Sequence, residues 1–303
     1  METDLFFQEN CTQYLLVNDD CMTAMHRIPN KSIDLILCDL PYGTTQNYWD
    51  KPLPLEDYVR LDSFVFNEAE YLLYAYSNGE TYQQARMFWK KNKLPGLWSH
   101  YKRIIKDRGC IALFCQVPFD SQLMASNFGM LKYEWIIEKT KATGFLNAKK
   151  APLKAHEKVL IFYKKAPVYN PQMIAGHTPV HKYTKRTGDG NCYGKTSLTS
   201  GGGSTLRYPR DVLRYKWDTQ KSKLHETQKP IKLLEYLIKT YTNEGAIVLD
   251  NCMGSGSTGV AAMECGRKFI GIEIDEEVFS VAENRIQDVF RNISAKEIKG
   301  VLT

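Results

Sequence analysis

One stretch in the last quarter of the chain constrains the fold more than any other. Residues 246–249 form a short apolar run that predicts a buried strand, and this run leads into Asp250 and a glycine-rich turn. An alanine-rich segment after the turn predicts a helix, and residues 268–272 predict a second strand that ends at Glu273. Strand, tight turn, helix and strand together form the repeating unit of a parallel α/β sheet. The chain is therefore predicted to be an open α/β protein.

The same turn indicates a ligand. Gly254, Gly256 and Gly259 follow a GxGxxG-like spacing, which lets a ligand approach the backbone at a helix N-terminus. Glu273, about 20 residues beyond the turn, is placed to bind a ribose diol. Asp250 would repel a pyrophosphate but attract an ammonium or sulfonium group. The alternative is a glycine-rich turn that binds nothing.

A second candidate site follows another buried strand. Residues 33–38 are apolar and lead into Asp39-Leu40-Pro41-Tyr42, where Pro41 ends the strand. Asp39 and the Leu40 carbonyl can accept hydrogens from an exocyclic amine, while the Tyr42 ring can stack on a planar base. The structural alternative is a helix-capping Asp followed by a buried turn Tyr.

The remaining pattern predicts the other elements and the class of partner. Residues 56–76, 82–91 and 97–106 have helical spacing, whereas 166–226 has poor periodicity and resembles a loop-rich recognition region. Residues 164–229 carry a net charge of +9 within a chain of net +6, which favours a polyanionic partner over a plain lysine-rich surface.

Composition excludes several other classes. No apolar run approaches the length of a membrane helix, and the N-terminus does not resemble a signal peptide. Eight cysteines without a CxxC pair indicate reduced thiols in a cytoplasmic protein, with no metal site and no disulfide framework.

In the chain, the Asp39 motif comes first and the glycine-rich motif near the C-terminus. Both motifs, in this order, resemble those of S-adenosylmethionine-dependent DNA amino-methyltransferases of the permuted β class, which methylate adenine N6 or cytosine N4. The catalytic motif of that class is [Asp/Asn/Ser]-Pro-Pro-[Tyr/Phe/Trp], and Leu40 here replaces its first proline. Residues 227–230 are similar to the segment that opens the helix before the cofactor strand, and Asp20 matches a position that contacts the cofactor adenine. The resemblance covers roughly residues 10–50, 97–170 and 205–290.

The resemblance implies a Rossmann-like methyltransferase fold with circularly permuted motif order. Its mostly parallel sheet has seven strands, one of them antiparallel, near residues 14, 34, 111, 135, 159, 247 and 269. The resemblance implies a catalytic domain made of three parts, residues 1–54, 97–165 and 227–303. It also implies a helical insertion at 55–96 and a target-recognition region at 166–226.

The resemblance also implies three groups of site residues. The catalytic group is Asp39, Leu40, Pro41 and Tyr42. The group that binds S-adenosylmethionine is Asp20, Asp39, Thr227, Lys229, Asp250, Met253, Gly254, Gly256, Ser257, Thr258, Glu273 and Ile274. The DNA-binding group is Lys139, Lys141, Lys149, Lys150, Arg186, Arg207, Arg210 and Arg214.

The implied activity is methyl transfer to adenine N6 in double-stranded DNA, by base flipping and direct in-line transfer. Asp39 favours adenine over cytosine, because Ser is commoner at this position in cytosine-N4 enzymes. Three alternatives stay open: cytosine-N4 methylation, methylation of RNA or a protein amide, and a catalytically inactive DNA-binding regulator. A homodimer through the aromatic-rich segment 56–91 is a further expectation, as is a cytoplasmic enzyme of a bacterium, an archaeon or a phage.

Overall fold

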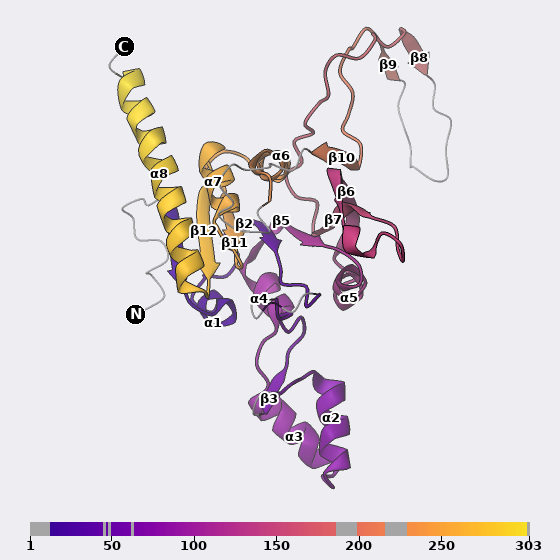
Figure 1. The fold of residues 1–303 in the computed structure, drawn as a ribbon, viewed down its shortest axis with the longest axis vertical. Coiled ribbons are helices and arrows are strands. Elements are labelled where there is room, and N and C mark those ends of the chain that lie inside the picture. The colour runs from indigo at the N-terminus through magenta and orange to yellow at the C-terminus, as the bar shows by residue number, and fades with distance from the viewer. Residues whose placement is uncertain are drawn as a thin grey trace.

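The computed structural model describes residues 13–44, 47, 50–61, 64–185, 199–215 and 229–301. Within them, eight strands form one sheet in the order β1-β12-β11-β2-β5-β7-β6-β10, and β7 alone runs antiparallel to its neighbours (Figure 1). The strands are β1 (Tyr14–Asn18), β2 (Ile33–Asp39), β5 (Ile105–Cys115), β6 (Leu131–Thr143), β7 (Lys154–Phe162), β10 (Val212–Tyr215), β11 (Ile247–Asp250) and β12 (Lys268–Glu273). The mostly parallel sheet is confirmed, and all seven predicted strands belong to it. The eighth strand, β10, comes from the segment predicted to be loop-rich.

Helices cover both faces of this sheet. They are α1 (Cys21–Met25), α4 (Leu97–Ile104), α5 (Phe119–Ser126), α6 (Ile231–Tyr241), α7 (Ser257–Glu264) and α8 (Glu276–Val301). Successive residues of β2 alternate between the faces, so that Ile36 packs in the core under α1, α4 and α5, whereas Leu35 and Leu37 pack under α6, α7 and α8. None of the helices in the described part of the chain is both long and apolar enough to cross a membrane.

Residues 55–61 and 64–96 form a lobe that projects from the sheet (Figure 1). It contains β3 (Val59–Leu61), β4 (Phe64–Phe66), α2 (Glu68–Ser77) and α3 (Tyr82–Asn92), and it has its own small core around Tyr71 and Trp89. The prediction of one helix over 56–76 was wrong for its first half, because the β-branched and aromatic residues there pair as a hairpin. α2 begins only after Asn67, whose capping box with Glu70 satisfies the first free amides.

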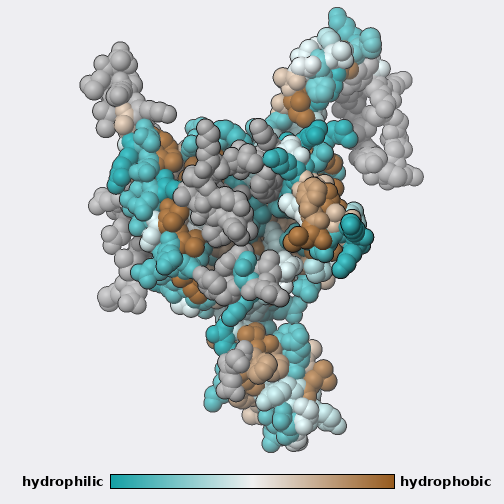
Figure 2. Space-filling view, in the orientation of Figure 1, coloured by the Kyte–Doolittle hydropathy of each residue, from teal (hydrophilic) through white to brown (hydrophobic). Residues whose placement is uncertain are grey.

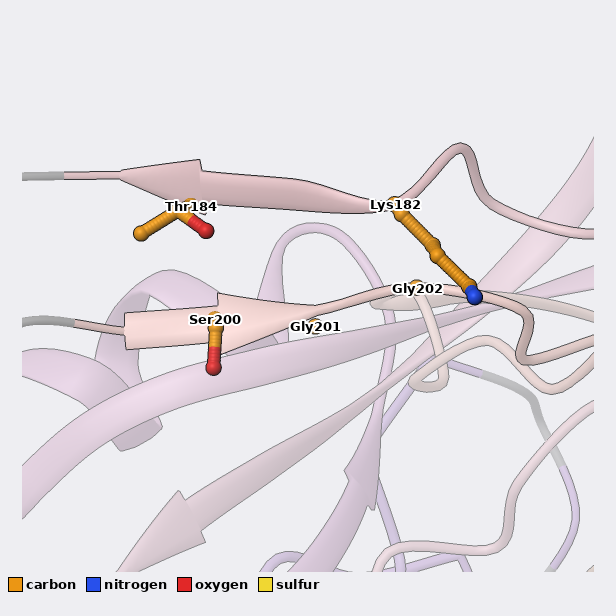
Figure 3. Close-up of a pocket in the computed structure, with 5 residues that line it drawn as sticks. All are labelled: Lys182, Thr184, Ser200, Gly201 and Gly202. Carbon is orange, nitrogen blue, oxygen red and sulfur yellow. The ribbon is translucent and has the colours of Figure 1, made fainter.

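Two other differences concern the chain around β5 and the recognition region. α4 ends at Ile104, two residues before the predicted end, since the chain passes directly into β5. Within 166–226, β8 (Tyr183–Lys185) and β9 (Thr199–Gly201) form a two-stranded arm at the end of the molecule opposite the lobe (Figure 1). Figure 3 shows a shallow hollow on this arm, lined by Lys182, Thr184, Ser200, Gly201 and Gly202.

Candidate active site

The sheet brings the predicted carboxylates to one edge. In a parallel sheet the carboxyl ends of the strands meet at the same edge, and Asp39, Asp250 and Glu273 are the last residues of β2, β11 and β12. Asp20 follows β1, whose last residue, Asn18, pairs with Glu273. The hollow of Figure 3 lies on the β8–β9 arm and shares none of these residues.

Asp39 is held by two side chains from different parts of the chain. Its Oδ2 lies 2.8 Å from Lys229 Nζ, and its Oδ1 accepts a hydrogen bond from the Tyr42 hydroxyl. One face of the Tyr42 ring stacks on Phe119 of α5, with the ring centroids 5.4 Å apart. The carboxylate, the Leu40 carbonyl and the tyrosine ring therefore lie within one short loop at the edge of the sheet.

A residue that the sequence analysis did not identify holds this loop in shape. The buried Asp50 carboxylate accepts hydrogen bonds from the backbone amides of Tyr42, Gly43 and Thr44, at 2.7 to 2.9 Å. These three hydrogen bonds fix the backbone that follows Leu40, the position at which the resembled motif has a proline. Its position, eight residues beyond Tyr42 in a polar loop, gave no signal in the sequence.

Lys229 also joins a buried ion-pair network. Its Nζ lies 3.1 Å from Glu157 of β7, and Glu157 forms a second ion pair with Lys139 of β6. Burial alone would lower the pKa of Lys229, but the charges of Asp39 and Glu157 outweigh burial and raise it. Burial raises the pKa of Glu157, and the two ammonium groups outweigh that effect and lower it.

This network changes the interpretation of Lys139, which was expected to contact DNA. Its side chain is 11% exposed and is paired with Glu157. A buried ammonium with a carboxylate partner is a poor phosphate ligand, so Lys139 belongs to the support of Asp39 instead.

The glycine-rich turn has two structural roles. Gly256 and Gly259 allow close packing, because a Cβ would lie 3.0 Å from Ala282 Cβ at Gly256 and 2.5 Å from Ile286 Cδ1 at Gly259. Gly254 differs, since nothing lies within 4 Å of the position its Cβ would take and its φ is +50°. Gly254 therefore borders open space at the edge of the sheet, where a ligand can approach the backbone.

Asp250 and Glu273 are held differently beside Gly254. Asp250 is buried at the start of the turn, and burial raises the pKa of its carboxyl group to about 6. Glu273 accepts hydrogen bonds from three backbone amides, including Gly254 N at 2.9 Å. The open space beside Gly254, a buried acid that forms no ion pair among the described residues, and an acid on the next strand fit a nucleoside that carries a positive charge.

The remaining residues predicted to bind the cofactor lie in varied environments. Asp20 caps α1 through the amide of Thr23 at 3.0 Å. The Met253 side chain is buried in the core against Gly271, so that only its backbone borders the turn. Ser257 and Thr258 are buried at the start of α7, while the Ile274 side chain is exposed. Thr227 lies outside the described residues.

The residues predicted to bind DNA are also divided. Lys141, Lys149 and Lys150 are exposed on the β6–β7 hairpin, and Arg210 is exposed before β10. Arg207 instead donates hydrogen bonds to the carbonyls of Thr178, Ser204 and Leu206, and so fixes the base of the arm. Arg214 lies 3.9 Å from Glu138, and Arg186 is outside the described residues.

Comparison with known proteins identifies the family. The model of the DNA methylase family N6_N4_Mtase matches residues 33–284. DNA adenine methyltransferase YhdJ of Escherichia coli (strain K12) is 26% identical over 306 residues, which cover 94% of this chain and 86% of YhdJ. The protein YubD of the same strain is 43% identical over 81 residues, so that the match spans only 35% of YubD.

A solved structure shows the same fold. The M1.HpyAVI–SAM complex is 18% identical to this chain, with a TM-score of 0.51, and the match covers 90% of this chain and 98% of that one. Because the family model covers most of the chain, including β2, the glycine-rich turn and β12, the protein belongs to the N6/N4 DNA methylase family.

Proposed function

We propose that this enzyme transfers a methyl group from S-adenosylmethionine to adenine N6 in double-stranded DNA. The observation that supports the proposal most strongly is the placement of Asp39. Its carboxylate lies at the same sheet edge as Asp250 and Glu273, and Lys229 and Tyr42 hold it in place. An acceptor for an amine and a site for a cationic nucleoside thus share one edge.

Asp39 and the Leu40 carbonyl position the target amine. A carboxylate only accepts hydrogen bonds, so Asp39 and Leu40 can each take one amino hydrogen and turn the nitrogen lone pair toward the methyl donor. Transfer is then direct, without a covalent enzyme intermediate. Such orientation of two reactants contributes up to ~7–11 kcal/mol in well-ordered systems. Asp39 Oδ1 can keep the hydrogen bond from the Tyr42 hydroxyl, because a carboxylate has about four acceptor sites and only two are used here.

The cofactor is S-adenosylmethionine, and when bound it supplies an electrophilic methyl group on a sulfonium. Asp250 attracts the positively charged part of the molecule, Glu273 accepts from the ribose hydroxyls, and Gly254 gives the ligand access to the backbone. Asp20, at the end of β1, contacts the adenine. Lys229 has no such role in this proposal, because its ammonium group is already paired with two carboxylates.

The target base leaves the helix before it reacts. An amine inside a stacked pair cannot reach a site at the edge of a sheet, so the nucleotide has to be flipped out. Tyr42 would stack on the flipped base through the ring face opposite Phe119. The permuted β-class order of the motifs and a recognition role for 166–226 are parts of the same proposal.

Adenine is preferred over cytosine as the target. An Asp at the first position of the motif favours adenine in the family that the chain resembles, and YhdJ is named an adenine methyltransferase. The test is to expose duplex DNA to the purified enzyme with S-adenosylmethionine and analyse the nucleosides by mass. N6-methyladenosine in its deoxy form is expected. If N4-methyldeoxycytidine is found instead, the target is cytosine and not adenine. If the DNA contains no methylated nucleoside, the result supports a catalytically inactive regulator.

A homodimer is a secondary proposal. The lobe carries exposed apolar side chains, including Phe64, Leu73, Tyr76 and Met87, and Figure 2 shows hydrophobic surface on it. Light scattering of the intact protein and of a Leu73→Ser/Met87→Ser variant tests this: a dimer that the variant converts to monomer is expected. Because its proposed substrate is DNA, we also propose that this enzyme acts in the cytoplasm.

A further inference from the structure

We propose that the tip of the β6–β7 hairpin, residues 144–150, enters duplex DNA beside the target base, and that Phe145 and Leu146 occupy the space this base leaves. The inference rests on the proposed function, because it assigns the DNA contact that accompanies base flipping. It concerns residues outside the catalytic loop and outside the 166–226 segment.

The register of the sheet shows that the hairpin extends beyond the site. Asp39 pairs with Phe114 of β5, Phe114 with Val159 of β7, and Val159 with Trp135 of β6. From Trp135, β6 continues for eight more residues to Thr143. At about 3.3 Å per residue, the hairpin extends on the order of 25 Å past the level of Asp39. Its tip is therefore long enough to contact DNA bound at that edge.

The base of the same hairpin is tied to the catalytic carboxylate. Lys139 of β6 pairs with Glu157 of β7, Glu157 pairs with Lys229, and Lys229 pairs with Asp39 at 2.8 Å. Because these groups are largely buried, the network fixes where the hairpin leaves the sheet relative to Asp39. The base of the hairpin and the catalytic loop are thus joined by one network of ion pairs.

The tip presents apolar side chains to solvent. Gly144 has φ +92° and turns the chain into a short 3-10 helix, Phe145–Asn147. The Phe145 side chain is 72% exposed and Leu146 is fully exposed. In Figure 2 hydrophobic surface lies over the β6–β7 region, next to hydrophilic surface. Two adjacent large apolar residues at the end of a protruding hairpin are costly in water unless they contact a partner.

Charge identifies that partner. Residues 139–156 contain no acidic residue, and beyond the buried Lys139 the hairpin carries Lys141, Lys149, Lys150 and Lys154. A protein partner for an apolar tip would not require lysines on both sides of it. In duplex DNA, phosphates flank an unstacked base on both strands, and lysines on both sides of the tip can neutralise them. Proteins that open a base step insert Phe or Leu between bases while cations contact the backbone. The hairpin tip has this combination.

The first experiment places the methylation site, once it has been mapped by sequencing methylated DNA, in two duplexes. One has the normal base opposite the target and the other has an abasic position there, so that less energy is needed to flip the target. For Phe145→Ala/Leu146→Ala we expect kcat/KM to fall at least 10-fold on the normal duplex and no more than about 3-fold on the other. The control Phe128→Ala removes an exposed aromatic side chain near the opposite end of β6 and should lower kcat/KM on neither duplex.

A second variant separates the lysines from the apolar pair. Lys149→Ala/Lys150→Ala should weaken binding to both duplexes equally, and the slope of log Kd against log salt should fall by up to ~2, about 0.9 per lost phosphate contact. The control Lys31→Ala/Lys93→Ala removes two exposed lysines that pair with Asp107 and Asp57, and should not change the slope.

Three results overturn the proposal: wild-type kcat/KM in the Phe145/Leu146 variant, an equal loss on both duplexes, or a loss accompanied by a lower melting temperature that explains it. If the wild-type protein methylates neither duplex, the proposed function fails. Anisotropy then tests the hairpin alone: the wild type should bind the abasic duplex more tightly than the normal one, and the Phe145/Leu146 variant should lose this preference. Equal wild-type affinities would refute the role of the tip.

Discussion

The glycine-rich turn and the β6–β7 hairpin tip border the same edge of the sheet but are built in opposite ways. The turn is mostly buried except beside Gly254, and the close approach of Gly259 to α8 leaves no room for even one methyl group. The tip projects into solvent, and Leu146 touches little of its own chain. A small cofactor can bind to a site that is already formed, whereas a base inside a duplex has to be flipped out of the stack, which needs side chains that project toward the DNA. The comparison predicts that mutations in the turn change cofactor affinity and protein stability. Mutations in the hairpin tip should instead change how strongly methylation depends on the base opposite the target.

The largest expected effect lies between the two regions, at Asp39. Asp39→Ala removes the proposed acceptor for the target amine, so kcat should fall at least 10³-fold. Calorimetry should show cofactor affinity within about 3-fold of the wild type. A variant that methylates DNA at the native rate would exclude Asp39 from catalysis, and a large loss of cofactor affinity would place it in the cofactor site.

The support of Asp39 should be the next most sensitive feature. Lys229→Met leaves Asp39 and Glu157 without their shared cation, and breaking a buried ion pair costs about 3–5 kcal/mol. Denaturant unfolding should show most of this loss, and kcat should fall with it. Glu157 keeps Lys139 as a partner, so the double variant Lys229→Met/Asp39→Asn removes the charge that Lys229→Met strands and should recover part of the stability. If it recovers none, the network does not act as a unit.

Asp250 should make both stability and cofactor affinity depend on pH. Burial raises its pKa in the folded protein to about 6 from an ordinary value of 3.8, with Cys38, Cys252 and Asp39 as the nearest titratable groups. The folded state thus binds more protons between pH 4 and 6, so stability falls as pH rises through this window, by on the order of 3 kcal/mol at most.

The carboxylate form attracts the cationic cofactor, so affinity should rise as pH increases through about 6 and then level off. Asp250→Asn should flatten both dependences and stabilise the cofactor-free protein at pH 7. Calorimetric titrations and thermal melts between pH 4.5 and 8 measure them. An unchanged profile in the Asn variant would assign the titration to another group.

The smallest expected effect distinguishes the glycines within the turn. Gly259→Val places methyl groups where Ile286 and Phe269 already pack, and overpacking of this kind costs about 1–3 kcal/mol. Gly254→Ala meets no neighbour, although its φ of +50° disfavours a side chain, so it should lose less stability and more cofactor affinity. A reversal of these two patterns would mean that the packed glycine, not the open one, contacts the cofactor.

The sequence predicted what depends on short local patterns. Apolar runs located the strands, and the residues that end β2, β11 and β12 were identified because strand ends can be found from composition and turns. Asp50 and Glu157 were not identified. Their roles depend on contacts made only after folding: Asp50 with amides across a loop, and Glu157 with Lys229, 72 residues away.

The same reason explains the wrong helix in the lobe and the unforeseen burial of Lys139. Aromatic residues near Phe64 fit a helix or a strand equally well until their pairing with Val59–Leu61 is known. Lys139 and Lys141 are equally cationic in sequence, and only the register of β6 with β7 places Lys139 beside Glu157.

The pairing of β1 with β12 has a consequence for synthesis on the ribosome. Tyr14 lies opposite Phe269, and β11 separates β12 from β2, so the earliest strands wait for the last ones before the sheet can close. The nascent chain therefore has to hold the apolar residues of β1 and β2 in an incomplete layer until about residue 273 has left the exit tunnel. Chaperones that shield such segments during translation should affect the yield of this protein more than that of one whose sheet forms in the order of synthesis.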